Sequence, residues 1–121
     1  MIYRLDVRPE AIADVQQAAA YIARGSMDHA MRLFDAVDAT YVQIRRTPEA
    51  WPKIPDLGEG KLAGLRHRSV IGFQNYQVVY KVQGNGIIIL RVLHAARDIA
   101  AILRSDTGEE HDGAGGQSPA V

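Results

Sequence analysis

The hydrophobic and polar positions along the chain switch from a period of two to a helical period and back. Residues 2–7 alternate, with Tyr3, Leu5 and Val7 on one side, which predicts a half-buried strand. Pro9 then suits the first turn of a helix, where its missing N–H costs nothing. The chain is therefore expected to pass directly from a strand into a helix.

Two amphipathic helices are predicted over residues 10–24 and 27–46. Gly25, which takes a left-handed conformation at little cost, is expected to end the first helix, and Ser26 to cap the second. A connection this short predicts an antiparallel helical hairpin. The apolar stripes recur at spacings of three and four, at Ile12, Val15, Ala19 and Ile22 in the first helix and at Ala30, Leu33, Phe34, Val37, Tyr41 and Ile44 in the second.

Residues 47–60 contain three prolines and two glycines and are predicted to form an irregular loop. Pro48 prevents continuation of the second helix. Trp51 lies within this loop, and we expect its large apolar ring to anchor the loop on the core.

Three strands are predicted after the loop, over residues 65–70, 76–82 and 87–93. The third is almost continuously apolar, which is typical of a central strand covered on both faces. The sequence Gly84-Asn85-Gly86 predicts a tight hairpin turn between the last two strands. Residues 71–75 are expected to connect the first two, and residues 98–103 to form a short helix.

This order of elements predicts an α+β fold with an N-terminal strand, a helical hairpin, a three-stranded antiparallel C-terminal meander and a short C-terminal helix. We expect the hairpin to cover one face of a four-stranded sheet and the other face to be only partly covered, so that a partner could dock there. Residues 1–104 would form a single domain. Residues 105–121 are acidic and rich in glycine, and are expected to be a disordered tail.

The composition restricts the possible chemistry. The chain has 121 residues and no cysteine, which excludes disulfides, thiolate metal sites and cysteine nucleophiles. Neither an apolar run of membrane-spanning length nor a secretory signal is evident, so we expect a cytoplasmic protein without membrane contact. The histidine spacing fits no zinc motif and no glycine loop fits a phosphate, so neither a metal nor a cofactor is expected.

The net charge is zero, but the charges are unevenly distributed. Residues 61–97 contain six lysines and arginines and no aspartate or glutamate. Such a segment favours acidic partners, although solvated cations on the edge of a sheet are an equal alternative.

Five residues of this segment are candidates for binding a target or partner. Arg66 and Arg68 are two apart, so on a strand they point to the same face. Arg91 interrupts an apolar strand and must find a partner or open onto a surface. His94 and Arg97 lie just beyond the end of that strand.

Other roles for these residues remain open. Arg97 could form an ion pair with a helix carboxylate such as Asp14, and His94 could be a hydrogen-bonded structural residue. His67, Tyr80 and Lys81, together with the arginines at 66 and 68, also supply the residue types that metal-independent RNA cleavage needs, but any basic strand pair would contain a similar set.

Three segments carry a resemblance to a known family. They are residues 64–66, residues 76–80 and residues 86–98, of which the closing sequence Arg91-Val92-Leu93-His94, followed by Arg97-Asp98, is the most specific. Together with the strand, helical hairpin and proline-bearing loop, they resemble the ParE branch of the ParE/RelE toxin superfamily. These are toxins of bacterial type II toxin–antitoxin (plasmid stabilisation) modules. The resemblance covers about residues 2–104.

The resemblance implies a toxin that is neutralised by a cognate antitoxin in a hetero-oligomeric complex. It implies inhibition of DNA gyrase by binding, without catalysis. One alternative is a RelE-like, ribosome-dependent mRNA endonuclease, and another is a degenerate, non-toxic member that binds an antitoxin. RelE-type nucleases often have a tyrosine near the C-terminus, and no tyrosine follows Tyr80 here. We further expect an amphipathic antitoxin segment to wrap the hairpin and the exposed sheet surface.

Overall fold

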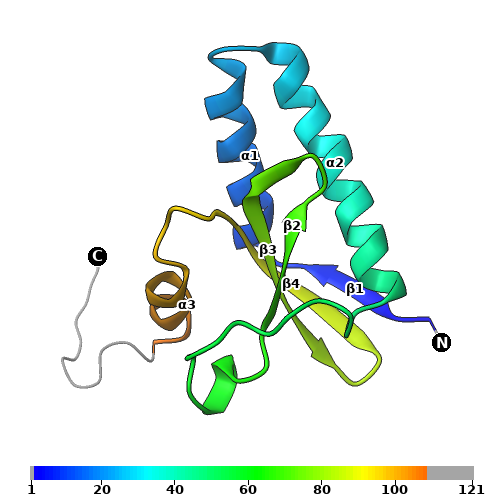
Figure 1. Cartoon of the computed structure of the whole chain (residues 1–121), viewed down its shortest axis with the longest axis vertical. Coiled ribbons are helices and arrows are strands. Elements are labelled where there is room, and N and C mark those ends of the chain that lie inside the picture. The colour runs from blue at the N-terminus through cyan, green and yellow to red at the C-terminus, as the bar shows by residue number, and fades with distance from the viewer. Residues whose placement is uncertain (1, 109–121) are drawn as a thin grey trace.

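The computed structural model of the chain describes residues 2–108 and has the predicted α+β architecture. The elements in chain order are β1 (Arg4–Val7), α1 (Pro9–Ala23), α2 (Met27–Arg46), the 3₁₀ turn η1 (Gly60–Leu62), β2 (Arg66–Val70), β3 (Phe73–Gln83), β4 (Gly86–His94) and α3 (Ile99–Thr107). Figure 1 shows α1 and α2 side by side as a hairpin, with α3 standing apart from them.

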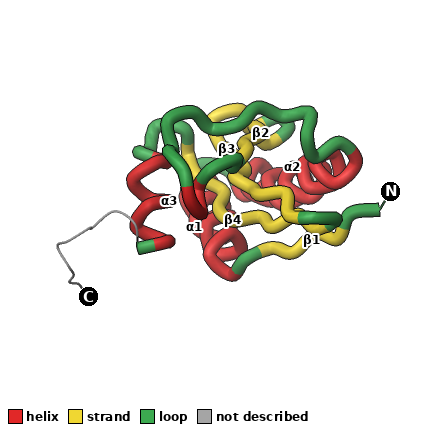
Figure 2. Tube along the Cα trace, turned by 90° about the horizontal axis from the view of Figure 1, so that it is seen from below, coloured by secondary structure: helices red, strands yellow, loops and turns green. Residues whose placement is uncertain are grey.

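The four strands form one sheet in the order β1-β4-β3-β2. β2, β3 and β4 pair antiparallel, as predicted for the meander, and β1 pairs parallel to β4. β4 is therefore a central strand, while β1 and β2 are the two edges. Figure 2 shows β1 beside β4 at one edge, and α3 at the end of the molecule away from the N-terminus.

Both helices begin where the sequence predicts. Pro9 opens α1, and the Ser26 hydroxyl caps α2 by accepting a hydrogen bond from the His29 amide at 3.1 Å. Gly25 follows α1, but the expectation of a left-handed conformation there was wrong. Gly25 is not among the glycines with positive φ, because the chain leaves α1 through Arg24 in the right-handed helical region. No helix among residues 2–108 is long and apolar enough to cross a membrane.

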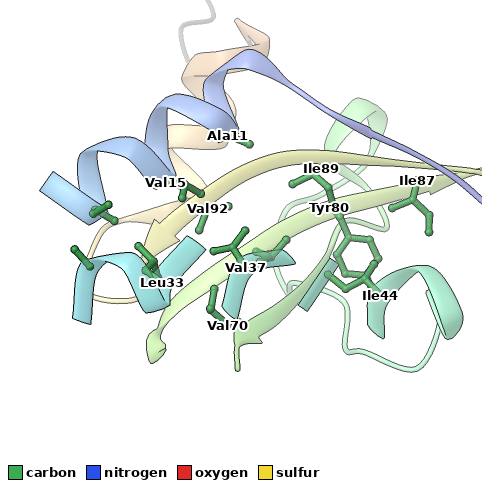
Figure 3. Close-up of a cluster of buried hydrophobic side chains, with 14 residues drawn as sticks. Ala11, Val15, Leu33, Val37, Ile44, Val70, Tyr80, Ile87, Ile89 and Val92 are labelled. Atoms are coloured by element: carbon green, nitrogen blue, oxygen red, sulfur yellow. The ribbon is translucent and has the colours of Figure 1, made fainter. Parts of the chain in front are cut away.

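The main core lies between the helical hairpin and one face of the sheet (Figure 3). α2 buries Ala30, Leu33, Val37 and Ile44 of its predicted stripe, but α1 packs through smaller residues than the sequence suggests. Its buried positions are Ala11, Asp14, Val15, Ala18 and Ala19. These small side chains let α1 approach the sheet closely. Ile12 and Phe34, both expected in the core, are 48% and 39% exposed.

A second, smaller core covers part of the opposite face. It lies under η1 and α3 and consists of Leu57, Leu62, Leu65, Val79 and Leu103. This partial cover agrees with the expectation for that face.

Two expected boundaries differ from the structure. β2 and β3 are joined by a tight turn at Ile71 and Gly72, where φ of Gly72 is +77°, instead of a connection over 71–75. The domain was expected to end at 104, but α3 continues through Thr107 and Asp106 is paired with Arg91. The remainder of the predicted tail, 109–121, lies outside the described residues.

Candidate functional site

The structure places the five candidate residues in three separate positions. Arg66 and Arg68 are on edge strand β2, Arg91 is in the middle of β4, and His94 and Arg97 are at the far end of β4. The five candidates therefore do not form one cluster, and each position has its own chemistry.

Arg66 and Arg68 share a face, as predicted, and both fasten the loop after α2. Arg66 Nη1 donates to the carbonyl oxygens of Trp51 at 2.6 Å and of Glu49 at 3.3 Å. The Arg68 guanidinium lies 4.3 Å from the centroid of the Trp51 ring and donates to Gln43 Oε1 at 2.8 Å. Trp51 packs against the main core, as expected of an anchor. Both arginines are half-buried and held by these contacts, and Arg68 Nε is buried without a hydrogen-bond partner among residues 2–108.

The outer edge of β2 is closed by its neighbours. The Ile54 amide donates to the Leu65 carbonyl at 2.8 Å and the His67 amide to the Pro52 carbonyl at 3.1 Å. Just beyond β2, the Ile71 amide donates to the buried Thr40 hydroxyl at 3.0 Å. These bonds leave little of this edge available for another strand.

Arg91 joins both sides of the sheet. Its guanidinium donates to both carboxylate oxygens of Asp14, Nε at 2.7 Å and Nη2 at 2.8 Å, and Nη1 donates to Asp106 at 3.0 Å. The hydrogen bond to Asp14 raises the pKa of Arg91 and outweighs the opposing effect of burial. Asp14 is thus paired with Arg91, and the suggested pair between Asp14 and Arg97 is wrong.

Asp14 also accepts a backbone hydrogen bond at the edge of β4. β1 pairs with β4 only as far as Ile89, so the next part of β4 has no neighbouring strand on that side. There the Asp14 carboxylate accepts a hydrogen bond from the Val92 amide at 2.9 Å. A charged residue on the buried stripe of α1 was the sequence signal for this contact, because a buried carboxylate needs a cation and donors.

His94 and Arg97 lie beside an open groove at the end of β4, which we call the terminal groove. Its volume is about 390 Å³, and it also receives Gln17 and Tyr21 from α1 and Tyr76 from β3. His94 Nδ1 accepts from the Ala96 amide at 3.0 Å, and its ring packs edge-on against Tyr76 at 5.1 Å. Arg97 is exposed, and its guanidinium makes no hydrogen bond or ion pair with any residue in 2–108.

A second groove was not predicted. It lies between α1, α2 and the end of β1, and we call it the hairpin groove. Its volume is about 330 Å³, and its lining is Val7, Ile12, Val15, Gln16, Phe34, Asp38 and Tyr41. Burial and the neighbouring Asp38 raise the pKa of Tyr41 to about 12, so its hydroxyl stays protonated. The apolar residues placed outside the core, Ile12 and Phe34, were the available sequence signal.

The hairpin groove adjoins a sheet edge that is open at Leu5 and Val7, whereas the Tyr3 carbonyl just before β1 accepts a hydrogen bond from Arg45 Nε at 2.8 Å. The amides of Arg4 and Arg8 donate inward, to Asn85 and Ile89 carbonyls, both at 2.9 Å. Alternate residues of a strand direct their backbone groups to opposite sides, so those of Leu5 and Val7 point away from the sheet. Neither residue makes a backbone hydrogen bond to an element outside the sheet within residues 2–108.

The residues considered for RNA cleavage are separated by the fold. Arg66 pairs with Tyr80 and His67 with Val79, which places His67 on the opposite face from the two arginines of β2. Tyr80 is fully buried, and its hydroxyl donates to the Pro48 carbonyl at 2.5 Å. Among residues 2–108, no three His, Cys, Asp or Glu side chains are placed to hold a metal ion.

One solved structure supports the fold. The chromosomal ParDE TA system from P. aeruginosa has a similar structure, with a TM-score of 0.61 and 16% identity over 77% of this chain and 96% of that chain. A copper-bound mutant toxin from Helicobacter pylori, 19% identical, gives a TM-score of 0.48 over 79% of this chain and 97% of that chain. No curated protein sequence matches.

A family model identifies the family, which structural similarity at such low sequence identity cannot do. The model of the ParE toxin of the type II toxin–antitoxin system, parDE, matches residues 5–99. This span starts in β1, ends at the first residue of α3, and covers most of the chain. The chain therefore belongs to the ParE toxin family of type II toxin–antitoxin systems.

Proposed function

We propose that this ParE-family toxin is held inactive by a cognate antitoxin and acts in the bacterial cytoplasm by binding DNA gyrase, without catalysing a reaction. The family membership carries the first part of this proposal. The separation of the acid–base residues between two faces and the core carries the second. Acid–base catalysis requires its groups within hydrogen-bond reach of one reacting centre.

We further propose that the antitoxin docks on the hairpin groove and the outer edge of β1. The groove has apolar walls from Ile12 and Phe34, both considerably exposed. An amphipathic helix buries its apolar face in such a groove, and an extended segment adds to an open sheet edge through backbone hydrogen bonds. The apolar groove and the open strand edge lie next to each other at β1, so one partner segment could bind both.

The alternative of mRNA cleavage is less consistent with the geometry. His67 Nδ1 is hydrogen-bonded to Gln77 Oε1 at 2.9 Å, and the Tyr80 hydroxyl is inside the core. Burial also raises the pKa of Tyr80 to about 12, despite the lowering effect of Arg66. Lys81 shares a face with His67, which pairs with Val79, so the separation concerns the arginines of β2 and the buried Tyr80.

The experiment is controlled expression of the chain without its antitoxin, combined with two readouts. Gyrase supercoiling by purified protein should be inhibited, and mRNA cleavage mapping should show no new cuts. Codon-specific cuts with intact supercoiling would contradict the proposal and favour the RelE-like alternative. Normal growth, with intact supercoiling and no new mRNA cuts, would favour a degenerate, non-toxic member.

A His67→Ala variant distinguishes binding from catalysis. Loss of a general acid or base commonly lowers a rate about 10²–10⁴-fold. A binding toxin should instead keep almost full potency in this variant. The cells' growth defect should weaken in steps when exposed cations such as Arg97 are removed, provided that each variant has the unfolding temperature of the wild type.

A further inference from the structure

The terminal groove is a second recessed surface, on a different face of α1 from the hairpin groove. α1 contributes Gln17 and Tyr21 to the terminal groove, and Ile12 and Gln16 to the hairpin groove. Residues 17 and 21 are one helical turn apart and therefore lie on one stripe of the helix. A ligand in one groove leaves the other accessible.

The charges around the terminal groove favour an anion. Asp14 is the one carboxylate among the lining residues, and it is occupied by Arg91 and by the Val92 amide. The Arg97 guanidinium has no polar partner within residues 2–108. Arg24 adds a second cation beside the groove, because its guanidinium lies 5.5 Å from the centroid of the Tyr21 ring.

The remaining lining residues offer donors and aromatic surface. Tyr21 is 66% exposed, and neither its hydroxyl nor that of Tyr76 is hydrogen-bonded within the described chain. Burial, and secondarily the neighbouring Tyr21, raises the pKa of Tyr76, so its hydroxyl stays protonated and able to donate. An aromatic ring next to several donors suits a ligand with both carboxylate and apolar groups.

We propose that the terminal groove binds an acidic segment of a partner protein. A carboxylate of that segment pairs with Arg97, and an adjacent apolar side chain packs against Tyr21. A nucleic acid is less suitable, because binding along a phosphate backbone requires a series of cations. Near this groove the other cation of β4, Arg91, is already committed to Asp14 and Asp106.

The test uses the full chain, labelled with nitrogen-15, and three probes. The first is the peptide acetyl-Glu-Glu-Leu-Phe-Glu-Glu-amide, the second is the same peptide with glutamine in place of each glutamate, and the third is a short oligothymidylate. We expect the acidic peptide to shift the backbone amide resonances of Gln17, Tyr21, Tyr76 and His94. The glutamine peptide should bind at least ten-fold more weakly, because charge-assisted hydrogen bonds are lost.

Two variants with matched charge changes locate the site. Arg97→Gln should weaken the acidic peptide roughly ten-fold, whereas Arg46→Gln, which removes an exposed cation at the end of α2, should leave binding unchanged. Tyr21→Ala should weaken it as well, without a change in unfolding temperature. Absent shifts, shifts at Ile12 and Phe34 instead, equal binding of the glutamine peptide or tighter binding of the oligothymidylate would each overturn the proposal. Because no readout involves gyrase or growth, the result is independent of the proposed function.

Discussion

The two edges of the sheet differ in how far other parts of the chain cover them. At β2, backbone and side-chain groups from the preceding loop and from α2 occupy the edge through Ile54, Pro52 and Thr40. At β1, the backbone groups of Leu5 and Val7 point outward beside an apolar groove. An uncovered edge is a site for pairing with another chain, and proteins usually block it. The difference is what the proposed docking of the antitoxin at β1 rests on.

Asp14 closes the part of the β4 edge that β1 does not reach, and its removal should have the largest effect. Asp14→Ala removes the acceptor of the Val92 amide and of Arg91 Nε and Nη2, which leaves Arg91 with Asp106 alone, and breaking such a buried pair costs about 3–5 kcal/mol. The free energy of unfolding, measured by urea denaturation, should fall by that amount.

Asp106→Asn is the matched control, because it removes the other carboxylate bound to Arg91. Asp106 has a side chain that is 38% exposed, so we expect a loss of about 1 kcal/mol or less. Equal losses in the two variants would show that Asp14 does not close the β4 edge as described.

The hairpin groove should account for much of the antitoxin affinity. Phe34→Asp places a charge in the apolar wall, and we expect the antitoxin to bind about 100-fold more weakly, or about 2.7 kcal/mol. Titration calorimetry with the cognate antitoxin measures this directly. Val42→Asp makes the same change at an exposed position of α2 outside the groove and should have little effect. Similar losses in both variants would contradict a docking site at the groove.

Reopening the closed edge should have a moderate effect on stability. In Thr40→Val the Ile71 amide loses its buried acceptor, which costs about 1–2 kcal/mol. Thr47→Val removes an exposed hydroxyl that donates to the Gln43 carbonyl and should cost less than about 0.5 kcal/mol. Thermal unfolding of the two variants checks the difference. If Thr40→Val were as stable as the wild type, the hydrogen bond from the Ile71 amide to Thr40 would not contribute to stability.

Much of this contrast could not be predicted from the sequence, although the fold could. Periodicity identified the helical hairpin and the meander because the apolar stripe of α2 and the alternation in β3 are directly visible. It also placed Ile12 and Phe34 in the core. A hydrophobic pattern identifies an apolar position, and whether the chain or a partner covers that position depends on the tertiary packing.

The candidate site was predicted in part for a similar reason. Arg91 was recognised as a residue that needs a partner, but its partner Asp14 is 77 positions away in sequence. The β4 edge that Asp14 closes exists only because β1 stops pairing at Ile89. His94 and Arg97 are close in the closing sequence motif, so their proximity could be predicted. The arginines of β2 contact Trp51, which lies in an irregular loop, and periodicity does not predict the contacts of such a loop.

Alkaline pH should destabilise the protein through a buried tyrosine hydroxyl near each edge of the sheet. The pKa values of Tyr41, beside the hairpin groove, and of Tyr80, whose hydroxyl donates to Pro48 in the loop after α2, are both raised to about 12 by burial. Above pH 10 the unfolded chain therefore releases protons that the folded chain retains, so stability falls as the pH rises from about 10 to 12. Tyr80→Phe and Tyr41→Phe should each make this decline less steep. An unchanged slope in both would contradict the burial of these hydroxyls.

Hydrogen–deuterium exchange of the toxin, alone and bound to its cognate antitoxin, tests most directly whether β1 is the edge kept open for the partner. The amides of Leu5 and Val7 point away from the sheet and donate no hydrogen bond to another element among residues 2–108. They should therefore exchange quickly in the free toxin and become protected in the complex. The amides of β2 should exchange at the same rate in both states. New protection at β2, with unchanged exchange at Leu5 and Val7, would contradict this account.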